Sequence, residues 1–173
     1  DAHTDLLVER LGIDLCFGSW CTHILDDLHE KHHLIQVGIR SSGRPQSHWE
    51  DTFGVRQHWA KDIKAQGINQ TIDNILSQLE NENIDELYIS FDIDGIDDSF
   101  ACATGTPEPD GLMPDDVMDI LRALVAKYPI TGADMMEIAP FTDSCGQGVA
   151  GQEKTLKVGA DISAFLLKEM ARN

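Results

Sequence analysis

Basic side chains are scarce in this sequence. It has 13 Lys and Arg against 30 Asp and Glu, which gives a formal net charge of −17 at pH 7. Nucleic-acid phosphates and anionic membrane surfaces would repel such a chain, whereas metal ions and cationic small molecules would be attracted to it. Because hydrophobic residues still make up 42% of the sequence, the acids belong to a globular protein with a core and not to a disordered acidic tail.

Long apolar runs, a signal peptide and a cysteine motif are also missing. No run approaches the length of a membrane span, and the first residues do not form a secretory signal. The four cysteines have neither C-x-x-C spacing nor a histidine pattern that would complete a zinc site. We therefore expect reduced thiols and a cytoplasmic protein that binds neither nucleic acid nor membrane.

The start of the chain lacks a methionine and the strand that its first residues would require. Asp1, His3 and Asp5 alternate along the sequence, as ligand-type residues do where a buried strand ends. We interpret residues 1–173 as a single domain that is the C-terminal portion of a longer protein.

Hydrophobic periodicity predicts alternating strands and helices. Apolar runs rich in β-branched residues predict strands over 33–40, 87–91 and 130–138. Apolar residues three and four apart predict helices over 68–79, 114–125 and 151–170, with a further helix over 19–32. In the last helix, the residues expected to face inward are Leu156, Ala160, Phe165 and Leu166. Residues 40–54 are interpreted as a surface loop.

This order of elements predicts an α/β protein. Strands joined by helices of crossover length run parallel and are covered on both faces, so we expect a three-layer α/β/α domain with a mostly parallel central sheet. Sites in such folds lie beyond the carboxyl ends of the strands. Candidate functional residues are therefore expected at that edge.

Two groups of ligand-type residues follow a strand or an expected strand. The first is Asp1, His3 and Asp5, and the second is Asp92 and Asp94. Side chains two residues apart in extended backbone project to the same side, so each group can converge on one point of the sheet edge. Gathering these carboxylates without a counter-charge would be costly, and neither group contains Lys or Arg. A divalent ion, or a pair of them, would supply that charge.

The donor atoms indicate which metal would bind. Carboxylates with an imidazole favour Mn²⁺ over the zinc of structural thiolate sites. Two such ions bridged by carboxylates would ionise a shared water near neutral pH. The alternative for residues 92–98, a solvated acidic turn, is disfavoured because they directly follow a buried strand.

Four motifs occur in an order that resembles a known family. They are Asp-Ala-His-Thr-Asp at 1–5, Ser-Phe-Asp-Ile-Asp-Gly-Ile-Asp at 90–97, Ala-Thr-Gly-Thr-Pro at 103–107 and Met-Glu-Ile-Ala-Pro at 136–140. Together they resemble the ureohydrolases, the family of arginase, agmatinase and formimidoylglutamase. The resemblance implies an arginase-like fold whose N-terminal portion precedes the first residue and ends in Gly-Gly-Asp-His, with one more metal ligand.

The resemblance also implies an activity and a set of site residues. It implies a manganese-dependent hydrolase of linear amidines that releases urea and an amine from a small cationic guanidino substrate. The residues that match ligands of a binuclear manganese centre are Asp1, His3, Asp5, Asp92 and Asp94. Asp5 would in addition move a proton from the water that the metals share. Family members form homo-oligomers, which implies a trimer or hexamer here.

Glu137 matches the carboxylate that receives the guanidinium of the substrate. The pairing makes physical sense because a guanidinium is a planar, always charged fork of donors that a carboxylate accepts bidentately. Without the surrounding motif, an acid at the end of a strand would be interpreted as a solvent-exposed residue at the edge of the sheet.

The sequence departs from the family at the position of a histidine that is thought to transfer protons. Many members have a His-Gly pair after the first metal motif, and Phe17-Gly18 takes its place here. Phe cannot transfer a proton, so we hypothesise that His23, at the start of the following helix, protonates the leaving amine.

Residues 8–14 point to two kinds of substrate. The acids Glu9 and Asp14 suit a cationic tail such as the amine of agmatine, whereas Arg10 would pair with the carboxylate of a guanidino acid. We favour hydrolysis of agmatine to putrescine and urea. The alternatives are arginase, formimidoylglutamase or guanidino-acid hydrolase activity, a deacetylase of similar architecture, and a non-catalytic metal-binding relative in which Phe17 marks lost chemistry.

Two further groups of residues receive structural interpretations. Three histidines before the first predicted strand are interpreted as solvated helix-end cations and not as metal ligands: His29, His32 and His33. Three tryptophans without a stacking period are assigned to packing: Trp20, Trp49 and Trp59.

Overall fold

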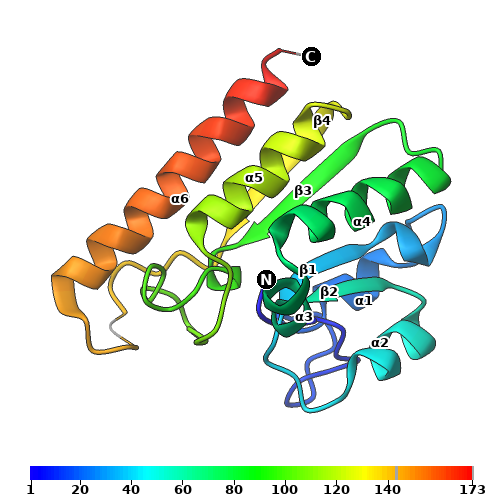
Figure 1. Ribbon diagram of the computed structural model, residues 1–173. Helices are drawn as coiled ribbons and strands as arrows, with labels where there is room; N and C mark the ends of the chain where they lie inside the picture. Colours follow the sequence, from blue (N-terminus) through cyan, green and yellow to red (C-terminus); the bar gives the residue numbers. More distant parts are fainter. Residues whose placement is uncertain (143, 173) are drawn as a thin grey trace.

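Helices and parallel strands alternate along the chain (Figure 1). The computed structural model describes residues 1–142 and 144–172. Its strands are β1 (Ile35–Ile39), β2 (Arg56–Trp59), β3 (Leu87–Asp92) and β4 (Ile130–Met136). Its α-helices are α1 (Trp20–Ile24), α2 (Gln46–Phe53), α3 (Ala60–Gln66), α4 (Ile68–Asn81), α5 (Pro114–Val125) and α6 (Gly148–Met170). Two short 3₁₀ helices are η1 (Lys31–His33) and η2 (Ile93–Gly95).

The strands form two parallel pairs. β1 pairs with β2, and β3 pairs with β4, so the described residues contain two two-stranded sheets. The first residues of the chain connect them: the backbone nitrogen of Asp1 lies 3.3 Å from the carbonyl oxygen of Val37, and the amide of Ala2 donates to the Asp94 side chain. The predicted α/β class with parallel strands is confirmed.

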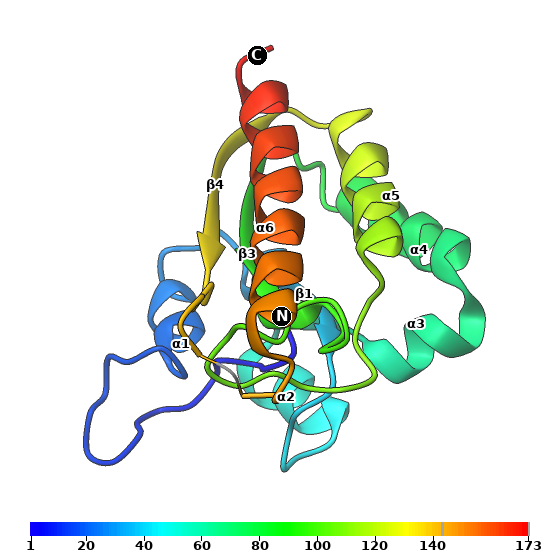
Figure 2. The ribbon, with the colours of Figure 1, turned by 90° about the vertical axis from the view of Figure 1, so that its left-hand side faces the viewer.

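The core forms where helices α4, α5 and α6 cover the strands (Figure 2). Ile162 and Leu166 of α6 pack with Ile93 and Ile96, which follow β3 directly. α4 and α5 bury a second apolar cluster that includes Ile75. Among the described residues, no helix combines the length and apolarity needed to cross a membrane.

The inward face of α6 differs from the prediction. Leu156 is 44% exposed and Ala160 is also exposed, whereas Leu166 is buried as expected and Phe165 packs at the edge of the core. The residues that face inward are Gly151, Thr155, Gly159, Ile162 and Leu166. Small residues face the core because the helix approaches closely: a Cβ at Gly159 would lie 2.3 Å from Cδ1 of Ile138. An apolar pattern alone cannot reveal such a contact.

Several other expectations need correction. A single helix was expected over 19–32. The structure has the short α-helix α1 near the start of this range and the 3₁₀ helix η1 at its end. The loop expected over 40–54 contains α2, which buries Trp49 and ends at Gly54 in the left-handed conformation. β2 was not predicted because its sequence is polar. The polar side chain of Gln57 is nevertheless buried in this strand, where it donates a hydrogen bond to the side chain of Gln36.

One face of β3 is open, although both faces were expected to be covered. Tyr88 is 64% exposed and Ser90 is exposed, while Ile89 and Phe91 pack against the core. The hydroxyls of Tyr88 and Ser90 both donate to the carboxylate of Asp134 on β4, each at 2.9 Å. The exposed and the half-buried side chains of this strand alternate accordingly.

Ile162 provides a test of how much α6 contributes to the core. Its side chain is 1% exposed, so Ile162→Ala should lower the free energy of unfolding by about 3 kcal/mol through lost burial and a cavity. Leu167→Ala, at a position 63% exposed on the same helix, should cost below about 0.5 kcal/mol. Chemical denaturation measures both. Equal effects would show that α6 does not pack as described.

Candidate functional site

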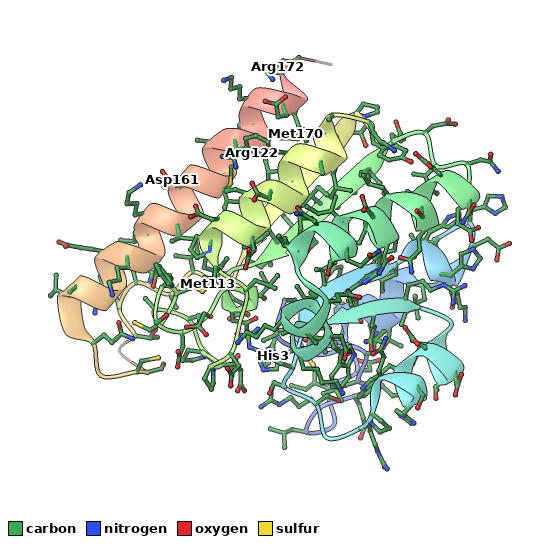
Figure 3. The ribbon with its side chains drawn as sticks, viewed as in Figure 1. His3, Met113, Arg122, Asp161, Met170 and Arg172 are labelled. Atoms are coloured by element: carbon green, nitrogen blue, oxygen red, sulfur yellow. The ribbon has the colours of Figure 1, made fainter. Side chains whose placement is uncertain are left out.

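The candidate site lies where β1 and β3 end. β3 ends at Asp92, and η2 places Asp94 one turn further on. Ala2 accepts hydrogen bonds from the amides of Arg40 and Ser41, just after β1, so the segment 1–5 lies at the same edge. Figure 3 labels His3 there, well below Arg172 in that view.

Asp94 is the residue on which this edge converges. Its side chain is 2% exposed. One carboxylate oxygen accepts the amide of Ala2 at 2.9 Å, and the other lies 2.9 Å from Nδ1 of His3. The hydroxyl of Thr106 lies 3.3 Å from that second oxygen. Three segments distant in the sequence are thereby joined at one buried carboxylate.

The approach of the first residues to η2 requires glycine at position 95. A Cβ on Gly95 would lie 2.5 Å from the backbone nitrogen of Asp1, closer than real Cβ contacts allow. The Asp-Gly pair after β3 therefore has a packing reason in addition to any chemical one. It lets the two predicted ligand groups come together.

Donor atoms of Asp1, His3 and Asp94 lie within 4.8 Å of one another. The remaining two predicted ligands lie beside this group. Asp92 accepts the backbone amide of Asp94 at 3.0 Å, and Asp5 accepts the indole N–H of Trp20 at 2.8 Å. The sequence predicted extended backbone with alternating side chains throughout residues 1–5. The extended backbone ends at Asp5, whose φ of 49° is left-handed.

The pKa values of these carboxyls shift in different directions, although burial raises all of them. Burial, together with the neighbouring Asp94, raises the pKa of Asp92 to about 7. Burial also raises the pKa of Asp5 against the opposing hydrogen bond from Trp20. For Asp94, burial acts in the same upward direction, but the hydrogen bonds from His3 and Ala2 outweigh it and the net pKa is lowered. The hydrogen bond to Asp94 in turn raises the pKa of His3.

Arg40 organises the loops around the site, and sequence patterns did not identify it. Its guanidinium donates to the carbonyls of Asp94 at 2.7 Å, Glu108 at 2.8 Å and Pro109 at 2.8 Å. The Glu108 side chain accepts from Ser41 and lies 3.7 Å from Nε2 of His3. The only available signal was an Arg at the end of a predicted strand, which does not distinguish a half-buried clamp from a surface charge.

Trp20 was assigned to packing and does pack beside Leu25 and Ile39. Its hydrogen bond to Asp5 adds a positioning role that no spacing in the sequence indicates. Trp49 and Trp59 are buried in the same cluster, as predicted.

Glu137 follows β4 with a left-handed φ of 62°. It is exposed, and a Cβ on Gly105 would lie 3.5 Å from its carboxylate. The amide of Ala139 donates to the carbonyl of Ala103, which ties the strand end to the Ala-Thr-Gly-Thr-Pro loop. The same loop reaches Asp94 through Thr106, so it lies between the donor group and Glu137.

His23 lies on α1 and is exposed. Its Nε2 is 2.8 Å from the carbonyl oxygen of Asp14. That contact fixes the ring against the 8–18 loop, where the Arg10 guanidinium lies 4.7 Å from the centre of the Phe17 ring. A role for His23 in proton transfer remains a prediction.

The chain's own side chains fit a divalent ion. Carboxylate and imidazole donors converge, two of the carboxyls have raised pKa values, and the Thr104 hydroxyl is buried without a hydrogen-bond partner in the described residues. Such a cluster is stabilised when a cation replaces protons as the counter-charge. The fold and site together are those of an α/β protein with a candidate metal centre at the carboxyl ends of its strands.

The chain is similar in sequence to known proteins. The model of the Arginase family matches residues 1–167. Mitochondrial agmatinase of Gallus gallus is 32% identical over 155 residues, covering 84% of this chain and 43% of that protein. Mitochondrial guanidino acid hydrolase of Homo sapiens is 32% identical over 149 residues, covering 84% of this chain and 41% of that protein.

Structural similarity agrees with the sequence match. The structure of proclavaminate amidinohydrolase from Streptomyces clavuligerus superposes with a TM-score of 0.80 and 31% identity, covering 99% of this chain and 55% of that one. The chain belongs to the arginase family. It spans about half the length of the curated relatives it matches.

The pKa values predict how pH affects the metal-free protein. Between the ordinary pKa of an Asp and a value of about 7, the folded state holds a proton on Asp92 that the unfolded state has released. Stability should therefore fall as pH rises from about 5 to about 8, and the raised pKa of His3 acts in the same direction. Thermal denaturation across this range tests it. Asp92→Asn should show a weaker dependence.

Binding of Mn²⁺ should have the opposite dependence. If Asp92 is a ligand, the ion would have to displace its proton, so the affinity should rise by up to about 100-fold over the same pH range. Calorimetric titrations at several pH values measure this. An affinity that stays constant would mean that Asp92 is not a ligand.

Proposed function

We propose that this chain carries the catalytic edge of a manganese-dependent ureohydrolase that cleaves agmatine to putrescine and urea. The observation that carries the proposal is the group of donors at the ends of β1 and β3, with Glu137 across the Ala-Thr-Gly-Thr-Pro loop. Family membership supports the reaction class. The names of agmatinase and guanidino acid hydrolase among its relatives support a guanidino substrate.

The residues proposed to hold two Mn²⁺ ions are Asp1, His3, Asp5, Asp92 and Asp94. Their oxygen-rich donor set suits Mn²⁺. When bound, the ions would supply an ionised water and stabilise negative charge that develops during attack on the guanidino carbon. Asp5, whose carboxylate accepts the indole N–H of Trp20, is proposed to accept and move the proton of that water.

Glu137 is proposed to position the substrate. Its carboxylate is exposed and next to Gly105, where no side chain fills the space beside it. A guanidinium that pairs bidentately with this carboxylate would have its plane fixed relative to the donor group. The left-handed backbone at Glu137 is consistent with a functional position, because strain of this kind is concentrated at sites where direction matters.

The leaving amine needs a proton, and we propose His23 as its source. Phe17 has no ionisable group, whereas the His23 imidazole is exposed and anchored through Nε2 to the Asp14 carbonyl. Its other ring nitrogen is left for exchange with solvent or substrate. The anchoring contact keeps the ring beside the loop that contains Phe17.

Agmatine is proposed over arginine because the 8–14 segment contributes acids, and because the whole chain has a net charge of −17 that attracts a dication. Arg10 is the observation that favours the second candidate, a guanidino acid. Its guanidinium, stacked on Phe17, would pair with a carboxylate at the far end of such a substrate.

Urea release from a substrate panel tests the proposal. The protein is isolated as its full translation product, loaded with Mn²⁺, and offered agmatine, arginine and 4-guanidinobutyrate. We expect agmatine to give the highest kcat/KM, and Glu137→Gln to lower that value by about 100-fold because a charged bidentate contact is lost.

Glu153→Gln provides the matched control, since Glu153 is exposed on α6 away from the donor group. Its kcat/KM should equal that of the unchanged protein. Preference for 4-guanidinobutyrate would select the second candidate. Absence of urea from every substrate would contradict a ureohydrolase.

The His23 hypothesis has its own test. His23→Asn keeps a polar group that can bond to the Asp14 carbonyl but removes the titrating imidazole. We expect kcat to fall about 10-fold or more and the limb of the pH–rate profile that reports the acid to disappear. Unchanged turnover and an unchanged profile would eliminate His23 as the proton source.

A further inference from the structure

A second group of metal-type donors lies at the other end of β1. Nitrogen and oxygen donors of His32, His33 and Glu82 lie within 4.8 Å of one another. We propose that these three residues form a binding site for a divalent transition-metal ion of the Zn²⁺ type. The site is distinct from the candidate catalytic centre and does not depend on the proposed function.

The three residues come from two elements that are distant in the sequence. His32 and His33 end η1, directly before β1, and Glu82 is the C-cap of α4. Nε2 of His32 lies 2.8 Å from a carboxylate oxygen of Glu82. The rings of His32 and His33 are nearly perpendicular, at 86°, with centres 5.1 Å apart. Both imidazoles therefore reach the same space from adjacent positions.

The histidines are not the freely solvated cations that the sequence suggested. His29 is exposed, but His32 and His33 are half-buried, and the side chain of His32 is 27% exposed. They line a cavity of about 210 Å³ together with Glu82, Gln78 and Asn81. The cavity has room for an ion with its bound water molecules. The amide side chain of Asn81 offers a further oxygen donor, whereas the amide oxygen of Gln78 lies 3.0 Å from Nε2 of His58.

The donor set selects a different ion from the one proposed at the carboxyl edge. Two imidazoles and one carboxylate are typical ligands of zinc in sites that keep a position for water. The carboxylate-rich group around Asp94 favours Mn²⁺ instead. Glu82 also lies at the C-terminus of a helix, where the helix dipole favours a cation. Arg56 lines the cavity as well but is exposed, so solvent screens its charge.

The two sites are separated by the length of a strand. His33 precedes β1, whereas Arg40, the clamp of the candidate catalytic centre, follows it. An ion at the His32–His33–Glu82 site would join η1 to the end of α4, two segments 50 residues apart. It would stabilise the folded state because the unfolded chain does not bring these donors together.

Zn²⁺ titration of the Mn²⁺-saturated protein, isolated as its full translation product, tests the proposal. Excess Mn²⁺ competes with Zn²⁺ at the carboxylate-rich group. Because Zn²⁺ binds most sites more tightly than Mn²⁺, the Zn²⁺ held at the proposed site is identified by its loss in variants of His32 and Glu82. We expect one Zn²⁺ per chain, and His32→Gln and Glu82→Gln should each weaken it by at least about 10-fold, since even outer partners of ligands contribute that much. Urea release should not change.

His48→Gln is the matched control, because His48 is a half-buried histidine on α2 whose ring contacts Trp49 and which lies outside the donor group. It should bind Zn²⁺ as the unchanged protein does. Equal Zn²⁺ affinity in His32→Gln and the unchanged protein would overturn the proposal. Equal weakening in His48→Gln would also overturn it.

X-ray absorption at the zinc edge reports the ligands of Zn²⁺ in the unchanged protein. This measurement does not depend on whether the variants fold. Two imidazole ligands per Zn²⁺ are expected at the proposed site. One imidazole or none would assign the ion to the group that contains His3 and would overturn the proposal.

Discussion

The fold at the candidate site depends on one buried carboxylate. Asp94 is almost without solvent contact, yet it accepts the amide of Ala2 and contacts the ring of His3, so its charge is balanced by groups from a distant segment. An unpaired charge in that position would cost several kcal/mol, as a rough figure for buried ions. The close approach of the two segments, which Gly95 permits, is therefore part of the chemistry of the site as well as of its packing.

Several buried carboxyls close together destabilise the folded state, and this cost is visible in their pKa values and in the backbone of the site. Asp92 and Asp5 have raised pKa values, while Asp94 is kept ionised by its hydrogen bonds. Asp5 and Glu137 both have left-handed backbones, a conformation that costs energy in residues with a Cβ. Such features are expected where selection favours a cation site over stability. A bound divalent ion would relieve the electrostatic part.

β1 separates two donor sets of different character. At its carboxyl end, oxygen donors predominate and Arg40 holds the surrounding loops through their carbonyls. At its amino end, two imidazoles and a carboxylate border a cavity between η1 and α4. Carboxylates predominate in one donor set and imidazoles in the other, so the two sets differ in the ligand type that they offer to a divalent ion.

The sequence by itself determined the parallel α/β class, three of the four strands among the described residues, the existence of helices α4, α5 and α6, and the proximity of Asp1 and His3 to Asp94. These follow from local periodicity and from the rule that strand ends share an edge. It could not determine β2, α2, the inner face of α6, or the positioning roles of Arg40 and Trp20, because each depends on a partner far away in the chain. Gly159 faces inward only because Ile138 is there, and Glu82 approaches His32 only because α4 ends beside η1. Contacts of this kind have no signal in the spacing of residues, so only the tertiary structure decided them.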